Sequence, residues 1–286
     1  MMTKTKIAGM GFYVPENVIT NKDLQKYMDT SDEWIQERTG IVERRYVKKH
    51  EETTSIMGAK AARKALDFAG VKKEDVDFII FATLSPDYFF PGSGVLMQRE
   101  LGITGTEIPA LDIRNQCSGF VYGLEVADQF IKTGKYKNIL LVGAEYQSMG
   151  MDFSTKGRNV SVIFGDGAGA VLLQPTTEEG KGILTTHIHS DGSNAEVLSF
   201  INPGSHGGYH LGKEHFGYDD SMPIGNGFIT EKMYKEDMLF PQMDGQTVFK
   251  TAVRKFPEVI MEALGTCGYT PQDLNLLIPH QANLRI

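Results

Sequence analysis

Short apolar runs alternate with stretches of helical periodicity along this chain. Five of the runs have the length and composition of buried strands: KIAGMGFYV, VDFIIFATLS, NILLVGAE, GAGAVLLQP and LNLLIPH. Apolar positions follow helical spacing over residues 53–69, 94–101, 118–133 and 245–264. This alternation predicts an α/β fold whose layers surround a largely buried sheet.

Two stretches of the chain resemble each other. Residues 69–85, AGVKKEDVDFIIFATLS, and residues 267–283, CGYTPQDLNLLIPHQAN, each lead from an expected helix through polar residues into an apolar run. Two pairs match in register at an offset of 198 residues: Gly70 with Gly268, and Asp75 with Asp273. The match suggests that the chain contains two related halves.

We place these halves at residues 1–175 and 176–286. Residues 201–241 interrupt the pattern of the second half, because they show little periodicity and contain several helix- and strand-breaking residues: Pro203, Gly207, Gly208 and Pro223. This segment is expected to be a long surface excursion or lid. If it caps an entrance, deleting it should change substrate selectivity.

The composition is that of a folded globular protein. The chain has 286 residues, of which 41% are hydrophobic and 23% are charged, and these values exclude a disordered or collagen-like chain. Its 29 basic and 36 acidic residues give a net charge of -7. No long basic run occurs, so we expect no nucleic acid and no anionic membrane as a partner.

Cysteine content and the N-terminus bear on the compartment. Cys117 and Cys267 are the two cysteines, too few for a disulfide scaffold or a cysteine-rich metal site. The N-terminal residues lack the continuous apolar core of a signal peptide, and the longest apolar runs are too short to cross a bilayer. We therefore expect a soluble, cytoplasmic protein.

Cys117 is a candidate nucleophile. An expected strand over residues 110–113 leads through a short polar turn to the cysteine, and a buried helix is expected to follow. The thiol would then lie at a helix N-terminus, where the macrodipole favours the reactive thiolate. The alternative, a small buried hydrophobic residue, is about equally consistent with the sequence.

His280 directly follows the apolar run at residues 274–279, and the end of a strand is where a sheet presents polar groups to a crevice. Alone, such a histidine is more often structural. Paired in space with Cys117, it would be an acid, a base or an oxyanion donor for thioester chemistry.

The stretch DTSDEWIQERTGI predicts a short helix. Thr30 and Glu33 fit a capping box, and Gly40 fits the terminating position. Trp34 and Arg38 are four residues apart and share one face. This face could hold an adenine ring and a phosphate, although spacing alone favours an ordinary half-exposed tryptophan with a stacked arginine.

Two further patterns carry weak functional signals. FGDGAGAVLL has three alternating glycines, but a strand-like run follows them rather than the helix of a nucleotide loop, so we expect a tight strand entrance. Histidines at 206, 210 and 215 lack a carboxylate or cysteine at ligand spacing. His187 and His189 alternate on an expected strand and share a face, but this evidence for a metal site is equally weak. We therefore expect no metal site.

Four motifs together resemble one known family. TSDEWIQERTGI, the CSGF turn, VIFGDGAGAV and PHQANLRI are similar to segments of 3-oxoacyl-[acyl-carrier-protein] synthase III, a condensing enzyme of the thiolase-like superfamily that initiates bacterial fatty-acid synthesis. The resemblance covers almost the whole chain apart from residues 201–241. It implies a layered α-β-α-β-α fold built from two related halves.

The resemblance also implies roles for individual residues. Cys117 in the first half would be the acyl-accepting nucleophile, and His280 in the second half would serve the condensation step. The implied contacts to coenzyme A and its pantetheine arm are Thr30, Trp34, Arg38, Arg158, Gly245, Phe249, Ala282 and Asn283. Gln281 and Arg285 would contact the carrier protein, and Phe90 would bound the acyl pocket of the partner subunit in a homodimer.

The implied reaction is a ping-pong condensation of a short acyl-CoA with malonyl-acyl carrier protein, with no metal or redox cofactor. Arg114, Asn115 and Gln116 precede the cysteine where well-known members carry small residues, which would alter the acyl pocket. The family's catalytic asparagine and a glycine-rich oxyanion segment would follow PHQANLRI, so we expect the second half to be truncated and the chain to be incomplete.

Two alternatives stay open. The enzyme could join a different acyl donor to a different acceptor, as relatives in secondary metabolism do. The chain could also be a non-catalytic condensing-like subunit, although the presence of both Cys117 and His280 argues against this.

Overall fold

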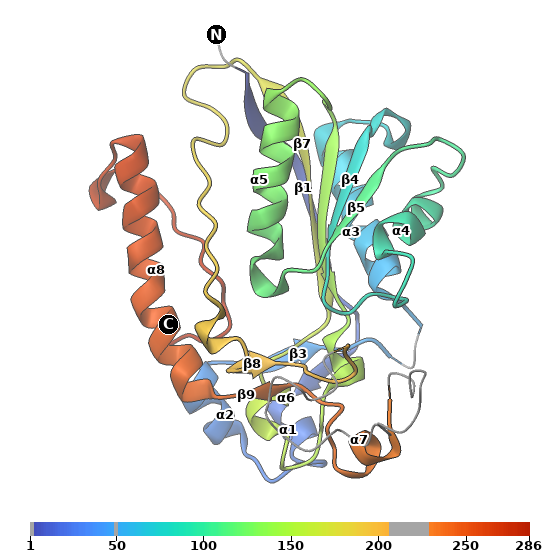
Figure 1. Cartoon of the computed structure of the whole chain (residues 1–286), viewed down its shortest axis with the longest axis vertical. Helices are drawn as coiled ribbons and strands as arrows, with labels where there is room; N and C mark the ends of the chain where they lie inside the picture. The colour runs from blue at the N-terminus through green and yellow to red at the C-terminus, as the bar shows by residue number, and fades with distance from the viewer. Residues whose placement is uncertain (1–2, 49–50, 206–228) are drawn as a thin grey trace.

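The computed structural model describes residues 3–48, 51–205 and 229–286. A five-stranded mixed sheet in the order β1-β7-β6-β4-β5 forms the centre of the fold (Figure 1). β4 is parallel to β5 and β6, whereas β7 is antiparallel to β6 and β1. The strands are β1 (Lys4–Tyr13), β4 (Phe78–Ala82), β5 (Ala110–Ile113), β6 (Ile139–Glu145) and β7 (Gly167–Thr176).

Helices cover both faces of this sheet. α3 (Thr54–Ala69) and α4 (Ser93–Leu101) pack on one face, and α5 (Gly119–Lys132) packs on the other. Because successive side chains of a strand point to opposite faces, β6 supplies both cores. Its Leu140 and Val142 belong to the core under α3, while Ile139 and Leu141 belong to the core under α5.

β1 lies unusually close to α3 because two of its residues are glycines. A Cβ atom at Gly9 would lie 2.2 Å from the carbonyl oxygen of Ala65, and one at Gly11 would lie 2.4 Å from that of Ala61. Any side chain at these positions would push the helix away from the sheet.

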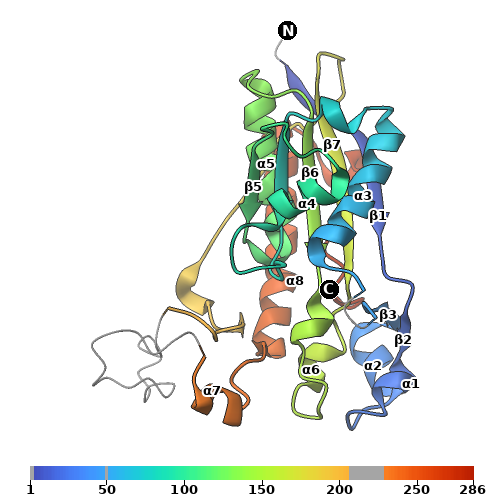
Figure 2. The same ribbon diagram turned by 90° about the vertical axis from the view of Figure 1, so that its right-hand side faces the viewer.

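The smaller elements gather at one end of the sheet, as Figures 1 and 2 show. β2 pairs with β3, and β8 pairs with β9, each pair antiparallel. These elements are β2 (Val18–Thr20), α1 (Asn21–Leu24), α2 (Asp32–Thr39), β3 (Glu43–Arg45), α6 (Arg158–Ser161), β8 (Leu198–Ser199), α7 (Glu231–Lys235) and β9 (Gln242–Met243). Short 3-10 helices are η1 (Lys73–Asp75), η2 (Gln116–Ser118), η3 (Gln147–Gly150), η4 (Gly192–Asn194) and η6 (Pro271–Asp273).

The long helix α8 (Gly245–Cys267) stands beside α5, and the segment that follows β7 runs between the two helices (Figure 1). No residue of α8 is buried, and Pro257 lies inside it. Among the described residues, no helix combines the length and the apolar character needed to cross a membrane.

Of the five apolar runs, four form the predicted strands to within a few residues, and the four helices expected from periodicity are confirmed, as is the short helix expected in DTSDEWIQERTGI. The expected strand LNLLIPH is wrong: residues 274–280 form no strand, and Leu276 and Ile278 are 72% and 76% exposed. The expected strand carrying His187 and His189 is also absent. A strand requires a hydrogen-bonded neighbour, and neither segment has one among the described residues.

The predicted excursion at residues 201–241 is only partly described. Its described parts contain α7 and a turn around the Asn202–Pro203 bond. Residues 206–228, which include the three histidines considered as metal ligands, lie outside the described residues. The boundaries of the two halves stay a prediction.

Candidate active site

A cavity of about 820 Å³ brings Cys117 and His280 together. The two residues are far apart in the sequence, and both line the cavity. The lining comes from α2, the turn before α5, the α6–β7 loop, α8 and residues 280–283. The predicted pairing of the cysteine with the histidine in one site is therefore supported by the geometry.

Cys117 lies in η2, between β5 and α5, as the strand-turn-helix prediction requires. Gly119 begins α5, and a Cβ atom there would lie only 3.1 Å from the Cβ of Ala82 at the end of β4. A small residue after CS therefore lets the helix start close to the sheet. Ser118, the N-cap, makes no capping hydrogen bond through its side chain.

The electrostatics of Cys117 differ from the prediction. Desolvation by the surrounding protein raises the pKa of its thiol, and the negative charge of Glu145 raises it further. A backbone hydrogen bond lowers the pKa, but this is the smallest of the three effects. These two effects oppose the preference for the thiolate that is expected at a helix N-terminus, and that preference stays a prediction.

Glu145 itself is held at the end of β6 by several donors. Its carboxylate accepts hydrogen bonds from the Leu84 amide at 2.9 Å, the Ser85 amide at 3.1 Å and the Ser85 hydroxyl at 2.6 Å. Burial nevertheless raises the pKa of Glu145. No sequence pattern marks this residue, because its donors come from the loop after β4, some 60 residues away.

One face of α8 forms part of the cavity lining. Gly245 and Phe249, which the family resemblance singled out, line the cavity. Val248, Ala252 and Phe256 line it as well and were missed, although their spacing of three and four residues places them on the same helical face. Asp244 starts the helix by accepting hydrogen bonds from the Gln246 and Thr247 amides at 3.1 Å each.

The segment 280–283 closes the cavity against α2. His280, Gln281, Ala282 and Asn283 all line it. The Asn283 side-chain amide donates to the Arg38 carbonyl at 2.9 Å, and the Leu284 amide donates to the Thr39 carbonyl at 3.0 Å. These two bonds tie the last residues of the chain to the C-terminal end of α2.

Trp34 is flanked by two guanidinium groups. The centre of the Arg38 guanidinium lies 4.5 Å from the indole centroid, and that of Arg158, from α6, lies 5.0 Å from it. Gly40 ends α2 in the left-handed conformation as predicted, with φ 77°. The N-cap is Ser31 rather than Thr30, since the Ser31 hydroxyl accepts the hydrogen bond from the Trp34 amide.

Four candidate residues lie outside the lining of the cavity. Arg158 contacts Trp34, which lines the cavity, but does not line the cavity itself. The Arg285 guanidinium lies 5.5 Å from the Phe249 ring centroid. Thr30 has a buried hydroxyl with no hydrogen-bond partner among the described residues. Phe90 is 82% exposed on another part of the surface.

The FGDG motif has a structural role beside the site. The Asp166 carboxylate accepts hydrogen bonds from the Val47 amide at 2.7 Å, the Ser148 amide at 2.8 Å and the Ser148 hydroxyl at 2.6 Å. These hydrogen bonds lower the pKa of Asp166, but burial raises it by more. A Cβ at Gly167, the first residue of β7, would lie 3.2 Å from the Tyr13 carbonyl oxygen, so the expected tight strand entrance is confirmed there.

Comparisons with known proteins identify the family of this chain. The family model of 3-oxoacyl-[acyl-carrier-protein (ACP)] synthase III matches residues 111–192. Beta-ketoacyl-[acyl-carrier-protein] synthase III of Xanthomonas euvesicatoria is 43% identical over 282 residues, covering 99% of this chain and 78% of the relative. The enzyme of the same name from Aquifex aeolicus is 42% identical over 282 residues, again covering 99% of this chain and 78% of the relative.

Solved structures show the same relationship. The crystal structure of 3-oxoacyl-[acyl-carrier-protein] synthase III from Aquifex aeolicus superimposes with a TM-score of 0.81 at 41% identity, over 98% of this chain and 78% of that one. The synthase III from Thermus thermophilus gives a TM-score of 0.80 at 35% identity, over 98% and 78%. The thiolase-like α/β fold is thereby confirmed, and the chain belongs to the β-ketoacyl-[acyl-carrier-protein] synthase III family, the condensing acyltransferases that initiate fatty-acid synthesis.

Proposed function

We propose that this chain condenses a short acyl group, delivered as acyl-CoA, with malonyl-acyl carrier protein. The observation that carries the proposal is the shared cavity of Cys117 and His280, one a nucleophile and the other a group that can move a proton or donate a hydrogen bond. The products are 3-oxoacyl-carrier protein, free coenzyme A and carbon dioxide.

In the first step, the Cys117 sulfur attacks the thioester carbon of acyl-CoA, the bond from that carbon to the coenzyme A sulfur breaks, and the acyl group stays on the cysteine. Because its pKa is raised, the Cys117 thiol is protonated at neutral pH and must lose its proton as the new bond forms. The departing coenzyme A sulfur takes up this proton and leaves as free coenzyme A.

In the second step, malonyl-carrier protein loses carbon dioxide, and the electron pair of the broken carbon–carbon bond forms an enolate. The enolate carbon attacks the acyl carbon, the carbon–sulfur bond to Cys117 breaks, and the released thiolate takes up a proton from solvent to regenerate the thiol. A donor placed at the enolate oxygen lowers the barrier, a role that suits the N–H of His280. The step balances without an oxidant or a reductant, so no redox cofactor is assigned.

Coenzyme A recognition would rest on Trp34. Adenine would stack on the indole in place of one of the two guanidinium groups that lie over the ring, and both groups would offer positive charge to the phosphates. The unpartnered Thr30 hydroxyl is a further donor, counted among the described residues. The pantetheine arm would follow the apolar wall toward Cys117, along Gly245, Phe249, Ala282 and Asn283.

We assign the carrier protein to the rim of the cavity. Arg285 presents a guanidinium beside Phe249 there, and Gln281 lines the cavity next to His280. A basic side chain at this rim complements an acidic carrier protein. We place the reaction in the cytoplasm, where the thiols of Cys117 and Cys267 stay reduced.

We also propose that the chain forms a homodimer through the β5 edge of the sheet. Among the described strands, β5 has a neighbour on one side only, and the loop after β4 exposes Tyr88, Phe89 and Phe90 by 52%, 69% and 82%. Open strand edges and contiguous exposed aromatic side chains are typical of protein interfaces. Light scattering should show a dimer that Phe90→Glu weakens, and a monomeric wild type would contradict the assignment.

Intact-mass spectrometry tests the central proposal. The protein incubated with acetyl-CoA should gain one acetyl group, and Cys117→Ala should gain none, whereas Cys267→Ala, the matched control for the other thiol, should gain it normally. Absence of an adduct with every short acyl-CoA would reject the proposal.

A further inference from the structure

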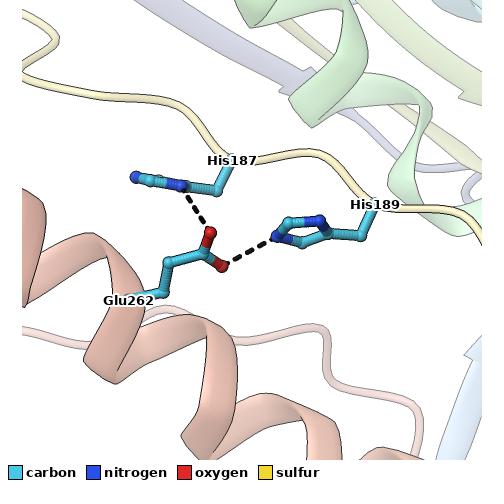
Figure 3. Close-up of side chains that lie close together, drawn as sticks. All are labelled: His187, His189 and Glu262. Atoms are coloured by element: carbon cyan, nitrogen blue, oxygen red, sulfur yellow. Dashed lines mark hydrogen bonds and ion pairs between the residues drawn. The ribbon is translucent and has the colours of Figure 1, made fainter.

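Two histidines and a glutamate meet outside the lining of the Cys117 cavity. His187 and His189 project from the segment between β7 and η4, and Glu262 projects toward them from α8 (Figure 3). His187 Nδ1 lies 3.1 Å from one carboxylate oxygen of Glu262, and His189 Nε2 lies 2.7 Å from the other. One ligand atom from each residue can be chosen so that all three lie within 4.8 Å of one another.

This set of donors matches the chemistry of a divalent transition metal. Two imidazoles and one carboxylate form a known protein ligand set for Zn²⁺, which leaves a fourth position for water. Zn–N and Zn–O bonds of about 2.0–2.2 Å place neighbouring tetrahedral ligands roughly 3.4 Å apart. The ligand atoms lie within 4.8 Å of one another, so the longest separation would have to shorten by up to about 1.4 Å to reach that geometry. The three side chains are only partly buried, so a metal ion could enter from solvent.

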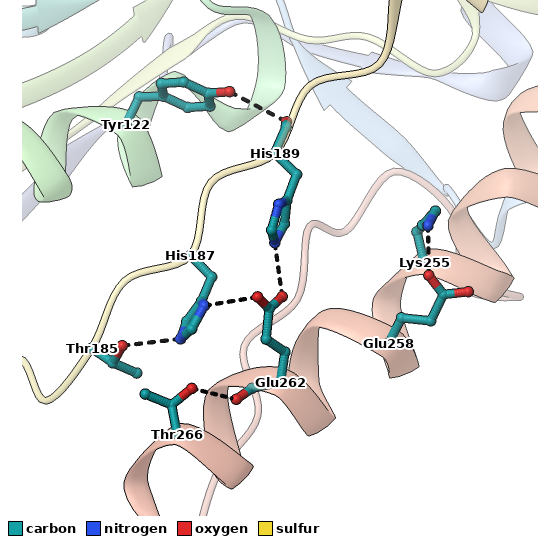
Figure 4. Close-up of polar contacts among 8 residues, drawn as sticks. All are labelled: Tyr122, Thr185, His187, His189, Lys255, Glu258, Glu262 and Thr266. Atoms are coloured by element: carbon teal, nitrogen blue, oxygen red, sulfur yellow. Dashed lines mark hydrogen bonds and ion pairs between the residues drawn. The ribbon is translucent and has the colours of Figure 1, made fainter. Parts of the chain in front are cut away.

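Surrounding contacts already orient the ligands, as Figure 4 shows. The second ring nitrogen of His187 lies 3.0 Å from the Thr185 hydroxyl, the outer partner that fixes the ring of a metal-bound histidine. The Tyr122 hydroxyl donates to the His189 carbonyl at 3.3 Å and pairs with the Ser190 hydroxyl at 2.9 Å. α5 thereby holds the backbone that carries the second ligand.

We propose that His187, His189 and Glu262 form a Zn²⁺-class metal site that fastens α8 to the body of the protein. Glu262 is the ligand from α8, whereas the two histidines belong to a segment bound to α5. No residue of α8 is buried, so this helix has few other attachments along its length. The same helix forms one wall of the Cys117 cavity through Phe249 and Phe256, and fastening it would stabilise that wall.

The sequence alone could not reveal this site. The carboxylate lies 73 residues beyond His189, and only the fold brings α8 alongside the histidine segment. The proposal is independent of the acyl-transfer chemistry, because its ligands do not line the catalytic cavity among the described residues.

The test is Zn²⁺ titration by calorimetry on chelator-treated protein without a histidine tag. Cys117→Ala and Cys267→Ala are introduced first, so that no thiol competes for the metal. We expect one equivalent of Zn²⁺ to bind and the melting temperature to rise. Co²⁺ in its place should give visible bands of a four-coordinate site without a thiolate charge-transfer band.

Matched variants locate the site. Loss of an outer partner typically weakens metal binding by roughly 10–100-fold, and we expect a loss of this size for Thr185→Val. Glu262→Gln and His189→Gln each remove a ligand and should weaken Zn²⁺ binding by more than this. Glu258→Gln, one turn earlier on α8 and paired with Lys255 (Figure 4), should bind Zn²⁺ like the parent protein.

Hydrogen exchange gives a readout that does not depend on activity. Zn²⁺ should slow amide exchange around residue 262 and around residues 185–190 in the parent and in Glu258→Gln, but not in Glu262→Gln. Binding that persists unchanged in both ligand variants, or no binding at all, would overturn the proposal and leave these residues as a carboxylate–imidazole ion pair.

Discussion

The two repeated stretches, residues 69–85 and 267–283, begin alike in the structure. α3 and α8 both end at a glycine in the left-handed conformation, Gly70 with φ 64° and Gly268 with φ 72°. The cap hydrogen bonds correspond as well, since the Gly70 amide donates to Asp67 and the Gly268 amide donates to Gly265. A short 3-10 helix follows each cap, η1 in the first stretch and η6 in the second.

The stretches then diverge. In the first, β4 lies between β5 and β6, and Ile79, Ile80 and Phe81 are 0% exposed. In the second, the corresponding apolar residues form no strand and lie exposed. Helix caps depend on residues within one turn, whereas a strand depends on partners elsewhere in the chain. Each repeated stretch therefore forms its helix cap from its own residues, whereas its apolar run forms a strand only where neighbouring strands are present.

The active site contains one residue beside the buried stretch and one residue after the exposed stretch. Cys117 lies at the end of the packed sheet, where β4, β5 and β6 hold its surroundings. His280 follows the exposed stretch and is fixed mainly by the two hydrogen bonds that Asn283 and Leu284 make with α2. We expect the nucleophile to be rigidly placed and the histidine to be placed by few contacts.

The largest expected effect comes from a pair of matching isoleucines, Ile80 and Ile278, which occupy the same position of the two stretches. Ile80 is fully buried, so Ile80→Ala should lower the free energy of unfolding by about 2–5 kcal/mol. Ile278 is 76% exposed, so Ile278→Ala should change it by less than about 0.5 kcal/mol. Urea unfolding followed by circular dichroism measures both values, and equal losses would show that the second stretch is packed like the first.

A smaller effect is expected at the coenzyme platform. Trp34→Ala removes the indole that lies between Arg38 and Arg158 and should raise the KM for acetyl-CoA by about tenfold, in line with a stacking contribution of about 1–2 kcal/mol. Acyl transfer from the acetyl thioester of N-acetylcysteamine, which lacks the nucleotide, should be unchanged. A similar loss with both donors would mean that Trp34 supports the fold rather than the coenzyme.

The smallest effect concerns the pH dependence of Cys117. Because its pKa is raised, less thiolate is present at a given pH, and alkylation by iodoacetamide should keep rising beyond the pH where an ordinary thiol levels off. Glu145→Gln removes the negative charge and should shift this profile to lower pH, with several-fold faster alkylation near pH 8. Alkylation of Cys267 in the same protein is the control, and an unshifted Cys117 profile would exclude the influence of Glu145.

Local sequence patterns predicted much of this molecule. The strand-turn-helix around Cys117, the terminating Gly40 and the shared face of Trp34 and Arg38 all depend on nearby residues and are confirmed. Three features depend on residues distant in sequence and could not be predicted this way. They are the raised pKa of the Cys117 thiol, the missing strand before His280, and the contact of Glu262 with the two histidines.

Separating the two half-reactions tests the account most directly. In a single experiment, intact-mass spectrometry follows the acetyl group on Cys117, and product analysis follows condensation after malonyl-carrier protein is added. We expect His280→Ala to acquire the acetyl group but to condense it at least about 100-fold more slowly than the wild type, as for loss of one donor to a developing oxyanion. Condensation at the wild-type rate in His280→Ala would contradict the assignment of Cys117 and His280 to one shared site.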